Sequence, residues 1–268
     1  MEKITLTPDG EKYLVLEADC ITPDAFAGKT LEEIRALEVW EGNTRWPLGR
    51  FFDVSGSVAA APADQAIVVN GSVPRVKYVG ARMTGGAVLC KGDVDMYCGA
   101  WMRGGSIIVK GSVDSFCGIQ MEGGQILIEG NAGNHLGASY RGDWRGMKGG
   151  DIVCNGNAGL DVGEYMMGGT ITVKGSVDIN AGIHMGRAVG PKEPGGKIVV
   201  YGDAVGRVGG QMIRGNIYVL GRVHNMMPGF GLKTPPQTEI EFDGKKIPFQ
   251  TYTGDRAEAG KGTLYIKA

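Results

Sequence analysis

The stretch GGSIIVKGSVDSFCGIQMEGG, residues 104–124, decides the fold of this 268-residue chain. It begins and ends on a glycine doublet, and the two doublets lie 19 residues apart. Residues 168–185, GGTITVKGSVDINAGIHM, repeat the same phrase. The pattern marks seven units, some lengthened by insertions, which begin at residues 85, 104, 123, 149, 168, 195 and 214. An internal repeat of this length predicts a stacked fold in which each unit contacts only its neighbours.

Within each unit, apolar residues alternate with residues of varied type. This alternation predicts a short strand with one buried face. The first inward column reads Val88, Ile107, Ile126, Ile152, Ile171, Ile198 and Ile217. A methionine column, suited to filling an irregular corner of a narrow core, reads Met83, Met102, Met121, Met147, Met166, Met185 and Met212. A glycine follows each strand, as at Gly111 and Gly130, where positive φ or close backbone approach is expected.

The repeat leaves no room for a helix, because 19 residues cannot hold a strand, a helix and two loops. We therefore predict an all-β chain. The expected architecture is a right-handed parallel β-helix, a single-stranded solenoid with about 19 residues per turn, stacked at about 4.8 Å. Two weaker turns are expected earlier, around residues 52–56 and 67–71. The predicted boundaries are 1–50 for an N-terminal cap, 51–231 for the glycine repeat and 232–268 for a C-terminal cap.

The two ends of the chain depart from the repeat and are expected to cover its open edges. Residues 3–6 and 13–16 are predicted to be strands around a turn at residues 8–10. Thr30 and Glu33 form a capping-box pattern, which predicts a short helix ending at Leu37. The first segment is thus a small α+β cap. Residues 232–268 are strand-rich, with a predicted turn at Asp243 and Gly244.

Composition limits the classes of partner. The net charge of −1 argues against nucleic acid and against an anionic membrane surface. The chain shows neither a signal peptide nor an apolar run long enough to span a bilayer, so a cytoplasmic location is expected. The five cysteines form no C-x-x-C pair and are predicted to be reduced and structural.

Two columns of polar or sulfur-bearing residues raise the question of a catalytic or metal site. Cys98 and Cys117 share an inward column, but it continues as leucine, valine and alanine, so buried thiols are favoured over a metal pair. Asp95, Asp114 and Asp178 share an outward column like the acids of carbohydrate-active β-helices. Glycines interrupt that column and the adjoining loops are short. A solvated face is therefore the preferred interpretation.

The three histidines, His135, His184 and His224, fall in different columns without an i+4 partner or a carboxylate pattern. Surface or contact residues are therefore expected rather than ligands. Taken together, the residues predict no catalytic residue, no cofactor-binding residue and no metal ligand in this chain.

Two insertions are the best candidates for function, because insertions on one face of a solenoid commonly form its binding surface. They span residues 140–146 and 186–194 and are expected to leave the coil at one corner, two turns and roughly 10 Å apart. The first is rich in residue types that anchor interfaces. The predicted partner contacts are Tyr140, Arg141, Asp143, Trp144, Arg145, Arg187, Lys192 and Glu193. The alternative is a decorated corner in which an Arg–Asp pair merely orders its own loop.

Specific motifs then point to a family. The glycine repeat resembles the glycine-repeat domain that closes the large subunit of glutamate synthase. KITLTP at the start, ITPDAFAGKTLEEIRALEVWEGN (21–43), LGRFFDVSG (48–56) and above all SYRGDWRGMKGG (139–150) make the whole chain resemble the C subunit of formylmethanofuran dehydrogenase. That tungsten or molybdenum enzyme reduces CO2 to formate and attaches it to methanofuran, in the first step of methanogenesis.

The resemblance implies a scaffold subunit that belongs to an oxidoreductase complex and has no catalytic centre of its own. The tungsten- or molybdenum-pterin, a zinc-type metal site and iron–sulfur clusters would lie in a metal-pterin subunit, a hydrolase-like subunit and ferredoxin-type subunits. Two alternatives stay open. One is the homologous subunit of the formyltransferase/hydrolase complex, which releases formate. The other is a stand-alone carbohydrate-active β-helix, against which the interrupted aspartate column counts.

Overall fold

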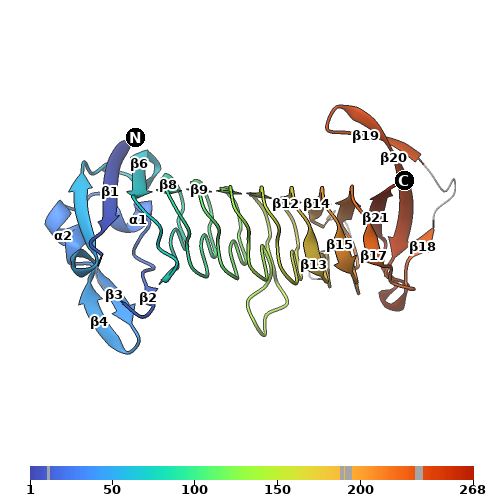
Figure 1. Ribbon diagram of the computed structural model, residues 1–268, viewed down its shortest axis with the longest axis horizontal. Coiled ribbons are helices and arrows are strands. Elements are labelled where there is room, and N and C mark those ends of the chain that lie inside the picture. Colours follow the sequence, from blue (N-terminus) through green and yellow to red (C-terminus); the bar gives the residue numbers. More distant parts are fainter. Residues whose placement is uncertain (11–12, 188–189, 191–194, 233–237) are drawn as a thin grey trace.

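Strands stacked along the long axis form the body of the molecule, as the computed structural model shows (Figure 1). The structure describes residues 1–10, 13–187, 190, 195–232 and 238–268. Their regular secondary structure is mostly strand, and their only α-helices are α1 (Pro23–Phe26) and α2 (Leu31–Arg35). The prediction of an all-β chain is confirmed.

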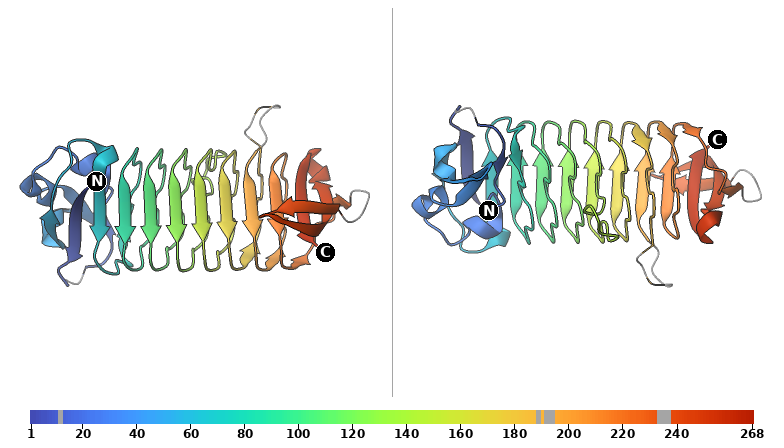
Figure 2. Two further views of the ribbon diagram at one scale, coloured as in Figure 1. Left: turned by 90° about the horizontal axis from the view of Figure 1, so that it is seen from above. Right: turned by 90° about the horizontal axis from the view of Figure 1, so that it is seen from below.

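One strand of each unit joins a single long sheet. Its central members are β6 (Gln65–Val69), β8 (Ala87–Cys90), β9 (Ser106–Val109), β10 (Gln125–Ile128), β11 (Asp151–Cys154), β12 (Thr170–Val173), β14 (Lys197–Val200) and β16 (Asn216–Val219). Neighbours pair in parallel and without slip, so that Ile107 faces Ile126 and Ile126 faces Ile152. Figure 2 shows these strands side by side along the stack.

A second side of the stack carries a parallel ladder of its own. Isolated bridges join Val73, Val94, Val113, Ala132, Ala158 and Val177 in order. The ladder ends in a three-stranded sheet of β13 (Val177–Ile179), β15 (Ala204–Gly206) and β17 (Val223–Asn225). Each coil therefore contributes one rung to each of two parallel ladders, with the narrow core between them.

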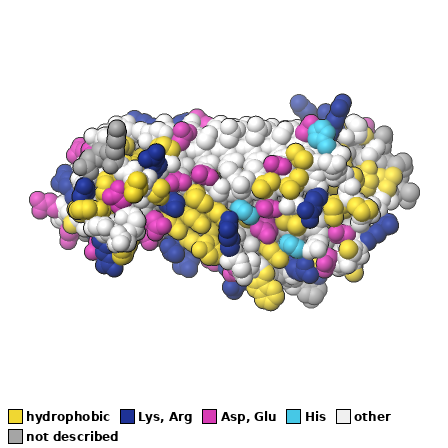
Figure 3. All heavy atoms as spheres, turned by 60° about the horizontal axis from the view of Figure 1, so that its bottom comes forward, with side chains coloured by type: hydrophobic (Ala, Val, Ile, Leu, Met, Phe, Trp, Pro, Cys, Tyr) yellow, Lys and Arg dark blue, Asp and Glu magenta, His cyan; other side chains and the backbone are white. Residues whose placement is uncertain are grey.

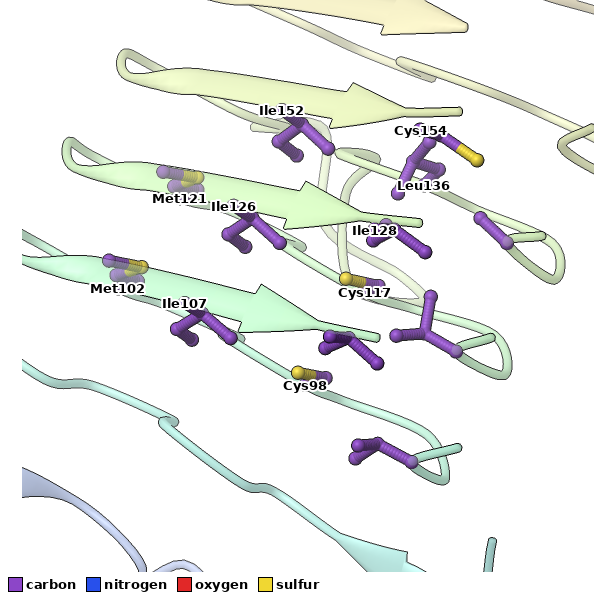
Figure 4. Packing of buried hydrophobic residues seen from close by; sticks show 14 of the residues in the cluster. Cys98, Met102, Ile107, Cys117, Met121, Ile126, Ile128, Leu136, Ile152 and Cys154 are labelled. Carbon is purple, nitrogen blue, oxygen red and sulfur yellow. The ribbon is translucent and has the colours of Figure 1, made fainter. Parts of the chain in front are cut away.

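The predicted inward columns form that core. Ile107, Ile126 and Ile152 are at most 1% exposed, and every member of the methionine column is fully buried. Figure 4 shows the isoleucine, methionine and cysteine side chains of successive coils pointing into the same interior. Because the same inward positions are apolar in every coil, stacking the coils removes the apolar face of each strand from water.

Glycine is required where two coils approach closely. Gly124 has φ +88°, and a Cβ there would lie 2.6 Å from the Met102 methyl carbon and 2.8 Å from the Gly105 carbonyl oxygen. Gly111 lacks a positive φ, yet a Cβ there would lie 2.6 Å from the backbone of Asp93. Close approach, rather than positive φ, thus explains the glycine that follows each strand.

The N-terminal segment extends the long sheet differently from the prediction. β1 (Glu2–Pro8) lies between β6, to which it is parallel, and β5 (Phe52–Gly56), to which it is antiparallel. The expected turn of the stack at residues 52–56 is therefore wrong, because β1 takes its place in the parallel ladder. Residues 67–71 do begin the stack, through β6.

The rest of this cap forms a separate four-stranded sheet. Its order is β4 (Thr44–Pro47), β3 (Glu38–Glu41), β2 (Leu16–Glu17) and β7 (Val76–Lys77). The expected strand at residues 13–16 is reduced to β2, which pairs with β3 and β7 rather than with β1. The capping box is confirmed: the Thr30 hydroxyl accepts the Glu33 N–H at 3.2 Å, and the Glu33 carboxylate accepts the Thr30 N–H at 2.7 Å. The helix ends at Arg35, two residues before the expected end.

The C-terminal segment closes the other end of the long sheet. β21 (Gly262–Lys267) pairs in parallel with β16, so the last strand of the chain acts as one further rung. β20 (Lys245–Gly254) covers β21, and β18 (Gly231–Leu232) and β19 (Thr238–Phe242) pair with β20. The predicted turn at Asp243 and Gly244 joins β19 to β20. Three 3-10 turns complete the described elements: Leu48–Arg50, Pro62–Asp64 and Arg256–Glu258.

Candidate partner-binding face

A column of stacked rings lies on the outside of one corner of the stack. Tyr78, Tyr97, Phe116 and His135 follow one another at 19-residue spacing. Their ring centroids are 4.8, 5.1 and 4.7 Å apart, and successive planes lie within 10° of parallel. All four residues have positive φ, between 60° and 67°. Non-glycine residues adopt this conformation at a cost of about 1–2 kcal/mol each, so ring stacking and the corner geometry must hold them there.

A second group of aromatic side chains widens this column into a face. The Trp101 ring lies 6.5 Å from both Tyr78 and Tyr97, nearly parallel to each. Tyr140, at the start of the first insertion, leans over the same rings at 6.4 Å from Tyr97 and 5.9 Å from Trp101. The Arg82 guanidinium stands 4.5 Å above the Trp101 ring. Figure 3 shows hydrophobic side chains gathered on the face from which the insertion projects, with cationic and histidine side chains among them.

The N-terminal cap turns one end of this face into a cleft of about 460 Å³. Its lining residues are Glu17, Asp19, Trp40, Tyr78, Arg82, Trp101 and Tyr140. Burial, reinforced by the nearby Glu17 carboxylate, raises the pKa of Tyr78 to about 12. The Tyr78 phenol therefore stays neutral and offers a hydrogen-bond donor inside an aromatic cleft.

The insertion at residues 140–146 is ordered by its own aspartate. The Asp143 carboxylate accepts two hydrogen bonds from the Arg145 guanidinium, both at 3.0 Å, and one from the Trp144 N–H at 2.8 Å. It also accepts the Gln120 amide at 2.8 Å, and that glutamine in turn accepts the Trp101 indole N–H at 2.7 Å. The Arg145 hydrogen bonds, with those from Gln120 and Trp144, hold the pKa of Asp143 well below its ordinary value. The loop is thereby tied to the aromatic face.

This network separates the predicted contact residues into two groups. Asp143 and Arg145 are used to shape the loop, as the alternative interpretation expected. Tyr140 and Trp144 remain 43% and 66% exposed. The exposed Arg141 lies with its guanidinium 5.6 Å from the Phe116 ring. The loop is thus ordered by its own hydrogen bonds while its large aromatic side chains stay exposed to water. A contact surface needs this arrangement, because exposed aromatic side chains can anchor a partner and a preordered loop loses little entropy on binding.

A second hollow of about 510 Å³ lies beyond the loop, so Tyr140 lines both hollows. His135 is at its floor, with Nδ1 3.4 Å from the Glu164 carboxylate and 3.8 Å from that of Asp161. Nδ1 is buried and makes no hydrogen bond with any described atom. The prediction that the histidines lack carboxylate neighbours is wrong here, because Glu164 and Asp161 belong to the next coil. It is wrong for His224 too, whose Nε2 lies 3.1 Å from Asp203.

The second insertion is only partly described. Arg187 donates to Glu258 at 3.0 Å and lies 3.2 Å from the His184 ring nitrogen, whose ring stacks on Tyr165 at 4.4 Å. Lys192 and Glu193 lie outside the described residues. Whether the two insertions are neighbours therefore stays a prediction.

The remaining candidate columns hold mainly structural residues. Cys90, Cys98, Cys117 and Cys154 are buried and all five cysteines are free. A hydrogen bond with Cys98 and then burial raise the pKa of the Cys117 thiol well above its ordinary value. Asp114 and Asp178 are exposed, as expected, but Asp95 is only 7% exposed. The prediction of a solvated aspartate face is therefore wrong for Asp95.

Neither a metal cluster nor a membrane-spanning helix occurs among the described residues. They contain no group of three or more histidine, cysteine or acidic side chains placed to hold a metal ion. In the same part of the chain, no helix has the length and apolar character needed to cross a membrane.

The aromatic column is the main feature that our sequence interpretation missed. Its signal was available, because Tyr78, Tyr97, Phe116 and His135 share the 19-residue period of the glycine doublets. The inward columns are easier to recognise because they are uniformly apolar. An outward column of mixed aromatic residues has functional meaning only once the fold shows that its rings stack.

Several known proteins are similar to part of this chain. No protein-family model matches it. Over 97 residues, the chain is 45% identical to the C subunit of tungsten-containing formylmethanofuran dehydrogenase 2 from Methanothermobacter thermautotrophicus, a match that covers 36% of each chain. The C subunit of molybdenum-containing formylmethanofuran dehydrogenase 1 from Methanosarcina barkeri is 39% identical over 97 residues, 36% of this chain and 32% of the relative. Such matches span about a third of the relatives' length.

Two other similarities cover nearly the whole molecule. A chain in the crystal structure of the formyltransferase/hydrolase complex from Methylorubrum extorquens, in complex with methylofuran, matches with a TM-score of 0.84 and 26% identity, over 98% of this chain and 99% of that one. The C subunit of tungsten-containing formylmethanofuran dehydrogenase 2 from Methanococcus maripaludis is 41% identical over 99% of this chain and 96% of its own length. This full-length similarity shows that the chain belongs to the family of formylmethanofuran dehydrogenase C subunits.

Proposed function

We propose that this chain is a non-catalytic scaffold subunit of a formylmethanofuran dehydrogenase complex, which reduces CO2 to formate and attaches it to methanofuran. The observation that carries the proposal is the 41% identity to a tungsten-type C subunit along almost the entire chain. In this proposal the metal-pterin, zinc-type and iron–sulfur centres belong to a metal-pterin subunit, a hydrolase-like subunit and ferredoxin-type subunits.

The scaffold role has a physical basis in the stack. We infer that the stack from β6 onward, within the predicted range 51–231, forms a right-handed parallel β-helix with a cap at each end, whereas β5 lies outside the parallel ladder. Consecutive coils are joined by two hydrogen-bonded ladders and by continuous apolar columns. A close-packed core of this kind transmits strain rather than bending freely. Such a rod would hold partner subunits in a fixed orientation, so that formate made at one site reaches the other.

The aromatic face with the 140–146 loop is the proposed contact surface. Tyr140, Trp144 and Arg141 supply exposed side chains of the types that dominate binding energy at interfaces. Asp143 and Arg145 hold the loop in shape, which reduces the ordering entropy that binding would otherwise cost. Arg187, Lys192 and Glu193 stay weaker candidates, since only their place in the sequence supports them.

A second candidate function is favoured by the structural similarity. The chain of the formyltransferase/hydrolase complex matches over 98% of this chain, so the same rod would also suit a complex that releases formate by hydrolysis. The two candidates differ in the partners and in their metals, and not in the architecture of this chain.

Anoxic purification of the tagged chain from its native host tests both candidates. Mass spectrometry would identify co-eluting proteins, and elemental analysis would identify metals. Stoichiometric iron–sulfur proteins with a tungsten or molybdenum subunit are expected. A formyltransferase without either metal would favour the second candidate, and a chain that elutes alone would refute both.

The proposed contact surface is tested by Trp144→Ala, with Leu14→Ala as its control. Both side chains are exposed, at 66% and 74%, and Leu14 belongs to the N-terminal cap. Loss of an anchoring tryptophan costs about 2 kcal/mol or more, so partner retention is expected to weaken by roughly 30-fold. Equal retention by both variants would remove the loop from the interface.

A further inference from the structure

The second ladder of the stack ends with a backbone N–H for which no described residue supplies an acceptor. In each coil, one residue donates its N–H to a carbonyl of the next coil, at 2.8–3.0 Å; these donors are Val73, Val94, Val113, Ala132, Ala158, Val177 and Ala204. Val223 of β17 is the next member of the series. No described residue supplies an acceptor to its N–H, and β17 pairs with β15 alone.

The apolar columns end at the same place. Ala204 and Val208 are at most 2% exposed because the next coil covers them. Val223 and Met227, their equivalents in the last coil, are only partly buried, and Met226 beside them is 38% exposed. At this end of the stack, the inward-facing apolar residues of the last coil are therefore not covered by any described strand.

Strands of this chain extend the long sheet at both of its ends. β1 extends the long sheet at its N-terminal end, and β21 extends it at its C-terminal end. Near the N-terminal end of the second ladder, β2 pairs in parallel with β7, which begins three residues after Val73. An edge strand is a ready template for another strand, and no described strand pairs with the free edge of β17, so a partner strand would fit there.

A groove runs along the open edge. It has a volume of about 430 Å³ and is lined by Gly221, Arg222, Val223, His224, Met226, Gln250, Tyr252, Ile266 and Lys267. Its apolar floor comes from β17, β20 and β21. Its charged lining residues are Arg222 and Lys267, and His224, which also lines it, has its Nε2 3.1 Å from the Asp203 carboxylate. None of the described residues lining the groove is acidic.

We propose that the β17 edge binds an extended, acidic segment of a partner polypeptide, which adds to the ladder as a parallel strand. The Val223 N–H supplies the first hydrogen bond, the continuing register requires an extended backbone, and the arginine and lysine select carboxylates. An apolar side chain of the segment covers Val223 and Met227, as the next coil does elsewhere. This site is separate from the 140–146 face and does not depend on the proposed catalytic context.

Hydrogen exchange in the assembly purified with the tagged chain tests this inference at single-amide resolution. The Ala204 amide, which is bonded within the stack, serves as the internal reference. We expect the Val223 amide to exchange within about tenfold of the Ala204 rate, because both would then be ladder amides. The proposal is overturned if the Val223 amide exchanges at the rate of an unprotected amide. This holds whether the chain is purified in an assembly or elutes alone.

Charge reversal and cross-linking identify the occupant. The double variant Arg222→Glu, Lys267→Glu should lose Val223 protection by at least about tenfold, whereas Lys245→Glu on the distant hairpin should keep it. Protection that survives the double reversal would rule out an acidic segment. A photoreactive group at position 226 is expected to cross-link to an acidic stretch of another polypeptide. Cross-links to this chain, or none, would overturn the proposal.

Discussion

Truncation of Met121 to alanine tests whether the methionine column supports the stack. The Met121 side chain is fully buried, and a Cβ placed on Gly150 would lie only 2.7 Å from its methyl carbon. Methionine-to-alanine changes in cores cost about 2–5 kcal/mol, depending on how far the site can collapse. Here collapse is restricted, because the Met121 carbonyl accepts hydrogen bonds from the Lys148 and Gly149 N–H groups, at 2.8 and 3.3 Å. We therefore expect a loss of about 4 kcal/mol.

Thermal unfolding followed by far-ultraviolet circular dichroism measures the effect. For a chain of this size, each kcal/mol lowers Tm by roughly 2–4 °C, so the expected decrease is on the order of 10 °C. Met226→Ala is the matched control, since its side chain is 38% exposed and its loss should change stability by less than about 0.5 kcal/mol. If the Tm of Met121→Ala equals that of Met226→Ala, the methionine column does not support the core and the reasoning fails.

Three further measurements address the coil contacts, the loop and the thiols. Gly150→Ala places a Cβ 2.6 Å from a backbone carbonyl oxygen, whereas a Cβ on Gly142, which has a similar φ, would meet nothing within 4 Å. Denaturant titration should therefore show that Gly142→Ala lowers the free energy of unfolding by about 1 kcal/mol, and that Gly150→Ala lowers it clearly more. The lowered pKa of Asp143 stabilises the fold fully above its ordinary pKa of 3.8, and this stabilisation is lost as the pH falls below that value toward the folded pKa. Arg145→Ala should raise the Asp143 pKa toward 3.8, as carboxyl-carbon NMR would measure. Burial raises the pKa of Cys20 to about 12, so even this least buried cysteine should resist iodoacetamide at pH 8 until urea unfolds the chain.

Local sequence was informative about the repeat because its physical causes are local. A glycine is needed wherever two coils nearly touch, and an apolar side chain wherever a residue points inward. Each requirement recurs at the same position of every coil. The spacing of the doublets therefore revealed the stacking, the inward columns and the two insertions. The capping box was predictable for the same reason, since Thr30 and Glu33 satisfy each other within one turn.

Predictions at the two ends were weaker because strand order depends on long-range pairing. Residues 52–56 alternate like a coil strand, yet β1 enters the ladder beside β6 and leaves β5 to pair antiparallel outside it. Similarly, alternation in residues 262–267 does not reveal that β21 completes the long sheet beyond β16.

The candidate site shows the same division. From the sequence alone, the repeat, its inward columns and the position of the 140–146 loop could be determined, because each depends on residues at fixed short spacing. Only the tertiary structure decided that Tyr78, Tyr97, Phe116 and His135 stack into one face, and that Asp143 orders the loop through Gln120 and leaves Trp144 exposed. It also decided that, among the described strands, β17 pairs with β15 alone. Those properties arise from contacts between different coils, and a coil's neighbours become known only when the whole chain is folded.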